Sequence, residues 1–177
     1  MNRDLEQALS QWDGKSTESL SAIHDALSPA PDFADRLLAL ARKTEFAAGA
    51  TWLLKRHLES GKSLSKNQIR ALWSLAGGLE HWEAKLHVLQ CLPFLPVEVS
   101  QKDQVAEFLR HCLGSGNKFV RAWAHGGFME LAGQHPEFEE ETESHLRRAT
   151  EGEAASVKAR IRQAARNHPR WEAYART

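Results

Sequence analysis

The chain has 177 residues, with 23 basic and 23 acidic side chains and a pI near 7.1. This balance excludes a general electrostatic attraction to nucleic acid or anionic lipid, and an apolar fraction of 42% excludes a disordered chain. Alanine and leucine together make 47 residues, against 15 valine, isoleucine and threonine residues. Because Ala and Leu favour helices and β-branched residues favour strands, the composition predicts an all-α fold. At this length we expect one domain over residues 1–177.

Apolar periodicity and turn residues predict two N-terminal helices, at 2–11 and 18–27, followed by four helix pairs. The pairs are expected at about 32–43 with 45–59, 65–78 with 81–95, 101–113 with 117–133, and 137–149 with 153–167. We expect residues 1–31 to cap the first pair, residues 32–168 to hold the four pairs, and residues 169–177 to form a tail.

The apolar residues of the helix pairs recur along the chain at a nearly constant spacing. The second helices align from Ala48, Ala84, Val120 and Val157, with offsets of 36, 36 and 37 residues. The first helices follow the same spacing, as at Phe33, Ile69 and Val105. Such helix pairs cannot bury their apolar faces alone, so stacked neighbours must supply the core. The period predicts an α-solenoid; the alternative is a helical bundle whose periodicity is accidental.

A basic residue follows the first apolar residue in three of the four second-helix segments, at Lys85, Arg121 and Lys158. This pattern resembles the HEAT-repeat family over about residues 32–167. The resemblance implies a right-handed α-α superhelix, a HEAT-like solenoid, of about four helix pairs with N-terminal capping helices. It also implies a scaffold that binds protein or nucleic acid on the surface lined by the second helices. The first pair departs from the pattern, because Gly49 occupies the basic position.

Each second helix also has a face opposite its apolar stripe, which is expected to meet solvent. Across the second, third and fourth pairs this face includes Glu83, His87, Phe119, Trp123 and Arg160. Aromatic clusters on an exposed face are typical of contact sites, and Trp is enriched among residues that dominate binding energies. These five residues are therefore our candidate partner-binding site.

Two alternatives concern the aromatic part of this site. Phe119 and Trp123 could instead pack beneath the C-terminal tail, under Trp171 or Tyr174. Gly126, in mid-helix, either allows two helices to approach closely or leaves a gap for a partner beside Trp123.

Motifs of catalytic or cofactor chemistry are not found: the sequence contains no HExxH, GxxxxGK[ST], GxGxxG or GxSxG. The nine histidines lack metal-ligand spacing, and Cys91 and Cys112 fall in apolar columns, as expected of buried free thiols. We therefore expect no catalytic residue, no metal site and no cofactor, and enzymatic activity is not favoured.

The leading hypothesis is a non-enzymatic interaction or scaffold module that binds a protein partner on the second-helix face. Residues 1–6 lack the apolar stretch of a signal peptide, and no uncharged run approaches the roughly 18 residues of a membrane span. We therefore expect a cytoplasmic protein without membrane contact. No oligomeric state is predicted.

The alternative hypothesis is a nucleic-acid-binding protein or a DNA-repair glycosylase-like HEAT protein. HEAT-like solenoids include glycosylases for alkylated purines, whose concave face the Trp123 region resembles. The resemblance implies base stacking by Trp123 and phosphate contacts by Arg121, Lys158 and Arg160. Those enzymes also place a carboxylate beside the aromatic residues, and Glu83 and Glu130 are the nearest candidates.

Overall fold

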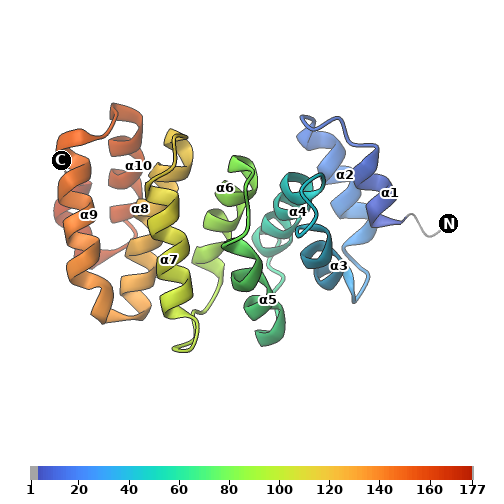
Figure 1. Cartoon of the computed structure of the whole chain (residues 1–177), viewed down its shortest axis with the longest axis horizontal. Helices are drawn as coiled ribbons and strands as arrows, with labels where there is room; N and C mark the ends of the chain where they lie inside the picture. Colours follow the sequence, from blue (N-terminus) through green and yellow to red (C-terminus); the bar gives the residue numbers. More distant parts are fainter. Residues whose placement is uncertain (1–3, 177) are drawn as a thin grey trace. The chain divides into compact units, whose positions relative to one another are not determined.

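The computed structural model describes residues 4–176, and every regular element in this range is helical (Figure 1). The all-α prediction is confirmed, and the start of the predicted helix 2–11 lies outside the described residues. The chain divides into two compact units, an N-terminal unit, Met1–Leu95, and a C-terminal unit, Pro96–Thr177. This division does not test the prediction of a single domain, which stays a prediction. None of the described helices is long and apolar enough to cross a membrane.

The N-terminal unit holds six α-helices in the described residues. They are α1 (Leu5–Ser10), α2 (Thr17–Leu27), α3 (Phe33–Leu40), α4 (Ala47–Glu59), α5 (Lys66–Ala76) and α6 (Trp82–Cys91), followed by the 3₁₀ helix η1 (Leu92–Phe94). Helix α4 packs against α2, α3 and α6 (Figure 1). Helix α5 begins at a capping box, in which the Ser65 and Gln68 side chains bond each other's backbone N–H groups. Each predicted helix over residues 18–95 is therefore present, within a few residues of its expected ends.

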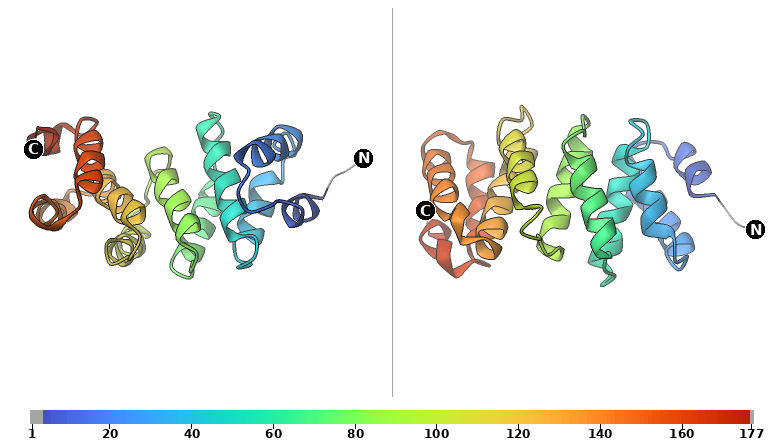
Figure 2. Two further views of the ribbon diagram at one scale, coloured as in Figure 1. Left: turned by 90° about the horizontal axis from the view of Figure 1, so that it is seen from above. Right: turned by 60° about the horizontal axis from the view of Figure 1, so that its bottom comes forward.

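The C-terminal unit is arranged around its longest helix. Its elements are α7 (Lys102–Leu113), α8 (Lys118–Gln134), η2 (Pro136–Phe138), α9 (Glu139–Gly152), α10 (Ala155–Ala165) and η3 (Pro169–Ala175). Helix α8 packs against α7, α9 and α10 (Figure 2). Side chains on several sides of α8 consequently lie at helix–helix contacts, and this places both sites described below.

The periodic apolar columns form the core of each unit. In the second helices Ala84, Val120 and Val157 are fully buried, as are Val88 and Ala124 one turn further on. In the first helices the column of Phe33, Ile69 and Val105 is buried as well. The 36-residue period therefore marks the buried face of both kinds of helix, except in the first pair, where Ala48 of the second-helix column is only half-buried.

Gly49 departs from the basic column because an N-terminal helix packs over it. A Cβ atom at position 49 would lie 2.8 Å from Cδ2 of Leu9 and 3.1 Å from the Trp12 ring. Leu9 belongs to α1, whose residues Leu5, Ala8 and Leu9 are buried. A lysine or arginine at position 49 would displace this helix, so the departure follows from the packing of Leu9 and Trp12 against the start of α4.

The residues after α10 form the short helix η3, which packs on α10. Trp171 is 2% exposed, and the Tyr174 hydroxyl donates to Oε1 of Glu143 on α9 at 2.7 Å. Arg170 also forms an ion pair with Glu139 at 3.0 Å. The tail is thus fixed to α9 and α10.

Candidate functional site

The predicted site residues belong to both units. Glu83 and His87 lie on α6 in the N-terminal unit, whereas Phe119 and Trp123 lie on α8 and Arg160 on α10 in the C-terminal unit. Each group is described within its own unit, and the prediction that all five form one site stays a prediction.

In the C-terminal unit Trp123 and Arg160 are in contact, and Phe119 lies one turn before Trp123 on the same helix. We call these three residues the aromatic patch. Helix α8 begins after Asn117, whose side chain accepts from the backbone N–H of Phe119 at 2.9 Å and caps the helix. Residues four apart share one face of a helix, so Phe119 and Trp123 project on the same side. The Phe119 side chain is 53% exposed, which excludes its packing beneath the tail.

Arg160 stacks on the indole of Trp123, with Cζ 3.6 Å from the ring centroid. Both side chains are half-buried, and no carboxylate among residues 4–176 is recorded as pairing with Arg160. Burial lowers the pKa of Arg160, and its Nε is buried without a hydrogen-bond partner in the described chain. An arginine stays protonated even so, and the π face of Trp123 is its main stabilising contact. The aromatic patch therefore carries a partly desolvated positive charge.

Gly126 lies one turn beyond Trp123 on α8. A Cβ atom at this position would lie 3.4 Å from Cβ of Ala164 on α10. This distance corresponds to ordinary contact between two helices, which favours the close-approach interpretation over a gap for a partner.

His87 lies at the contact between α4 and α6. Its Nδ1 is 3.1 Å from Oγ1 of Thr51, and the Thr51 hydroxyl donates to the carbonyl of Ala47 at 2.7 Å. Burial, aided by the nearby charge of Lys55, lowers the pKa of His87 to about 4. His87 is therefore a neutral residue that joins two second helices.

Glu83 lies in the first turn of α6, after the N-cap His81, and is half-buried. Its carboxylate is 3.7 Å from Nδ1 of His81. Both residues line a cavity of about 470 Å³ in the N-terminal unit, together with Trp12 and Phe46. The structure thus places Glu83 beside the N-terminal helices.

Equivalent repeat positions contact each other in both units. Thr51 and His87 are 36 residues apart, and Trp123 and Arg160 are 37 residues apart. In each pair the two side chains bridge neighbouring second helices. The predicted face is therefore used in part for packing between helices, and Phe119 is its most exposed predicted residue in the C-terminal unit.

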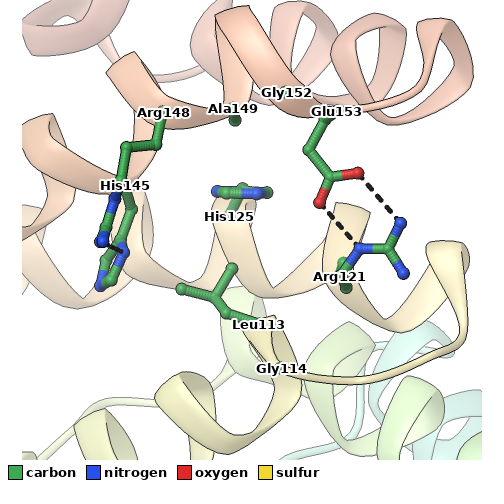
Figure 3. Close-up of a pocket in the computed structure, with 9 residues that line it drawn as sticks. All are labelled: Leu113, Gly114, Arg121, His125, His145, Arg148, Ala149, Gly152 and Glu153. Atoms are coloured by element: carbon green, nitrogen blue, oxygen red, sulfur yellow. Dashed lines mark hydrogen bonds and ion pairs between the residues drawn. The ribbon is translucent and has the colours of Figure 1, made fainter.

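A cavity of about 500 Å³ in the C-terminal unit was not predicted from the sequence, and we call it the histidine cavity (Figure 3). It is lined by Leu113, Gly114, Arg121, His125, His145, Arg148, Ala149, Gly152 and Glu153. These residues come from α7, α8, α9 and the start of the α9–α10 connection. No motif joins them in the sequence; the basic column that contains Arg121 was the only signal.

One wall of the histidine cavity is a closed ion pair. The Arg121 guanidinium binds both carboxylate oxygens of Glu153, at 2.7 and 3.0 Å, and also donates to the carbonyls of Ser115 and Gly116. The hydrogen bond from Arg121 lowers the pKa of Glu153. This geometry links the α7–α8 turn to the α9–α10 turn and leaves little binding capacity free.

Within residues 4–176, no group of three or more His, Cys, Asp or Glu side chains is arranged to hold a metal ion. Cys91 and Cys112 are buried thiols that form no disulfide, as predicted. Burial raises the pKa of the Cys91 thiol far above its usual value, so this group is unreactive at neutral pH.

Comparisons with known proteins do not identify a relative. No protein-family model matches the chain, and neither the curated proteins nor the solved structures contain a match. The site must therefore be interpreted from its own geometry.

Proposed function

We propose that the chain is a HEAT-like interaction module that binds a protein partner on its second helices, with the aromatic patch at the centre of the binding surface. Three features support this proposal: the repeated helix pairs, an exposed aromatic side chain beside a stacked Trp–Arg pair, and a nearly balanced charge.

The HEAT-like part of the proposal draws on the repeat geometry. The apolar columns spaced by 36 or 37 residues are buried in the first helices and, from the second pair on, in the second helices. Neighbouring second helices also touch at equivalent positions, Thr51 with His87 and Trp123 with Arg160. A right-handed solenoid of four pairs with an N-terminal cap accounts for both features.

The observation that carries the binding proposal is the exposure of Phe119. The residue is 53% exposed, one turn before Trp123, which is stacked with Arg160. An aromatic side chain at such a position gains most from burial against a partner, and the rigid Trp–Arg stack offers a preorganised neighbour.

The charge around the aromatic patch indicates the chemistry of the partner. Lys118 lies over the Phe119 ring with Nζ 5.4 Å from its centroid, and Arg160 has no recorded carboxylate partner in the described chain. A partner segment that combines an apolar side chain with a carboxylate would bury Phe119 and pair with these cations.

Site-specific photo-crosslinking tests the proposal. A benzophenone amino acid replaces Phe119 in one protein and Phe94 in a matched control, since Phe94 is 49% exposed and lies in the other unit. We expect a discrete protein adduct from position 119 and none of that size from position 94. The substitution Trp123→Ala should reduce the yield of the adduct from position 119. Identical adducts at both positions, or none at position 119, would overturn the proposal.

The nucleic-acid alternative has weaker support. Arg121 is engaged by Glu153, Glu130 lies 3.1 Å from His168, and one face of Trp123 is covered by Arg160. Of the groups assigned to phosphate contact, acid chemistry and base stacking, Arg121, Glu130 and one face of Trp123 thus already have partners within the protein. A duplex-DNA shift at low salt that weakens as salt rises would favour this alternative, and no shift would dismiss it.

A further inference from the structure

The histidine cavity does not include the residues of the aromatic patch, and its lining holds a cation without a carboxylate partner and a buried nitrogen without a hydrogen-bond partner. Its volume of about 500 Å³ lies within the range of small-molecule sites. Leu113 and Ala149 give it apolar walls, and Arg121 and Glu153 neutralise each other. Arg148 and His125 remain.

Arg148 is an exposed residue at the cavity and contributes a positive charge that has no carboxylate partner in the described chain. Its guanidinium donates to Nδ1 of His145 at 2.7 Å, and no carboxylate within residues 4–176 is recorded as its partner. The other ring nitrogen of His145 lies 3.3 Å from Glu141, which Arg110 holds through two hydrogen bonds. This chain of contacts orients Arg148 while leaving most of its N–H groups unused.

His125 contributes a buried imidazole of which one nitrogen has no hydrogen-bond partner in the described chain. The residue is 5% exposed, and its Nδ1 is buried without a hydrogen-bond partner in the described part of the chain. In Figure 3 the ring lies among the other lining residues, between the α9 segment and Leu113. Because burial lowers the pKa of His125 to about 4, the ring is neutral near pH 7 and offers one donor and one acceptor. Buried polar groups without a partner are rare in folded proteins and call for an occupant.

We propose that the histidine cavity binds a small organic anion, a carboxylate or phosphate attached to an apolar group. The anionic oxygens pair with the Arg148 guanidinium, a polar atom of the ligand bonds to His125, and the apolar group lies against Leu113 and Ala149. The positive charge of Arg148 favours a negatively charged ligand, and the apolar walls favour an organic molecule over an inorganic ion.

NMR titration of the whole protein with phenyl phosphate, benzoate and the neutral phenol tests this site. We expect saturable shifts of backbone amides around Arg148 and of the His125 ring nitrogens with at least one of the two anions below about 10 mM, and none with phenol. Binding of phenyl phosphate alone identifies a phosphate ligand, and binding of benzoate alone identifies a carboxylate. Absence of saturable binding by both anions, or equal binding of phenol, overturns the proposal.

Two neighbouring arginines on α9 give matched variants. Arg148→Gln should weaken anion binding by about tenfold or more, because it removes the charge-assisted contact. Arg147→Gln should leave it unchanged, since Arg147 is 71% exposed, lies 3.8 Å from Glu143 and does not line the cavity. Equal affinity in the two variants overturns the assignment of Arg148.

Discussion

Burial lowers the pKa of the His87 imidazole to about 4, and this shift makes folding stability depend on pH. In the unfolded chain a histidine titrates near 6.5, so on acidification the unfolded state binds the proton first. The stability that neutral His87 provides is therefore complete above about pH 6.5 and is lost as the pH falls toward 4. His125, with its pKa also lowered to about 4, adds to the same loss.

Replacing His87 with glutamine should remove its share of this pH dependence. Glutamine keeps a polar group near Thr51 but does not titrate. Between pH 7 and pH 5 we expect the wild type to lose roughly 1–2 kcal/mol more unfolding free energy than His87→Gln. Urea unfolding at a series of pH values measures the difference. Equal losses in the two proteins would show that His87 is not neutral and desolvated in the folded state.

The sequence predicted the side of each second helix on which the candidate residues lie, but not what they touch there. Periodicity identifies the apolar stripe, so Phe119 could be placed on the opposite face, where it is exposed. It does not show which side chains are long enough to bridge to the next helix. The Trp123–Arg160 stack depends on the distance between α8 and α10, which no local pattern encodes.

At the scale of helices, we expect opposite effects of alanine at two helical glycines, Gly126 in the middle of α8 and Gly49 in the first turn of α4. Gly126→Ala should match or exceed wild-type stability by up to about 1 kcal/mol, because alanine favours the helix. Its Cβ would meet Ala164 at 3.4 Å, an ordinary contact distance. Gly49→Ala should destabilise by about 1 kcal/mol or more, because it overpacks a filled contact. Its Cβ would lie 2.8 Å from Leu9 and 3.1 Å from the stiff Trp12 ring, which holds α1 in place.

Thermal unfolding of the two variants decides this prediction, and each serves as the control for the other. A Gly49→Ala protein as stable as Gly126→Ala would contradict the close packing of α1 on α4.

The helices could be predicted because their apolar residues repeat at one spacing and turn residues separate them. The histidine cavity could not be predicted from the sequence, because His125, His145 and Arg148 lie on two helices and their side chains meet only when these helices pack together. Gly49 is a second example of a tertiary contact that the local sequence does not predict. Its departure from the basic column is visible in the sequence, whereas its cause, the contact with Leu9 and Trp12, is tertiary.

For the whole molecule, the proposed solenoid predicts an extended particle in solution. A compact domain of 177 residues has a radius of gyration of about 16 Å. Stacking helix pairs along one direction gives a larger radius of gyration. The radius of gyration of the monomer, measured by small-angle X-ray scattering, should therefore exceed about 16 Å. A radius at or below about 16 Å would favour the helical bundle over the solenoid.

The central claim, that the aromatic patch binds a protein, is tested most directly by the affinity for the partner captured from position 119. Calorimetry with that purified partner compares the wild type, Phe119→Ala and the matched Phe94→Ala. We predict that Phe119→Ala weakens binding by about tenfold or more while circular dichroism shows an intact fold, and that Phe94→Ala binds as the wild type does. Wild-type affinity in a folded Phe119→Ala protein would contradict the claim.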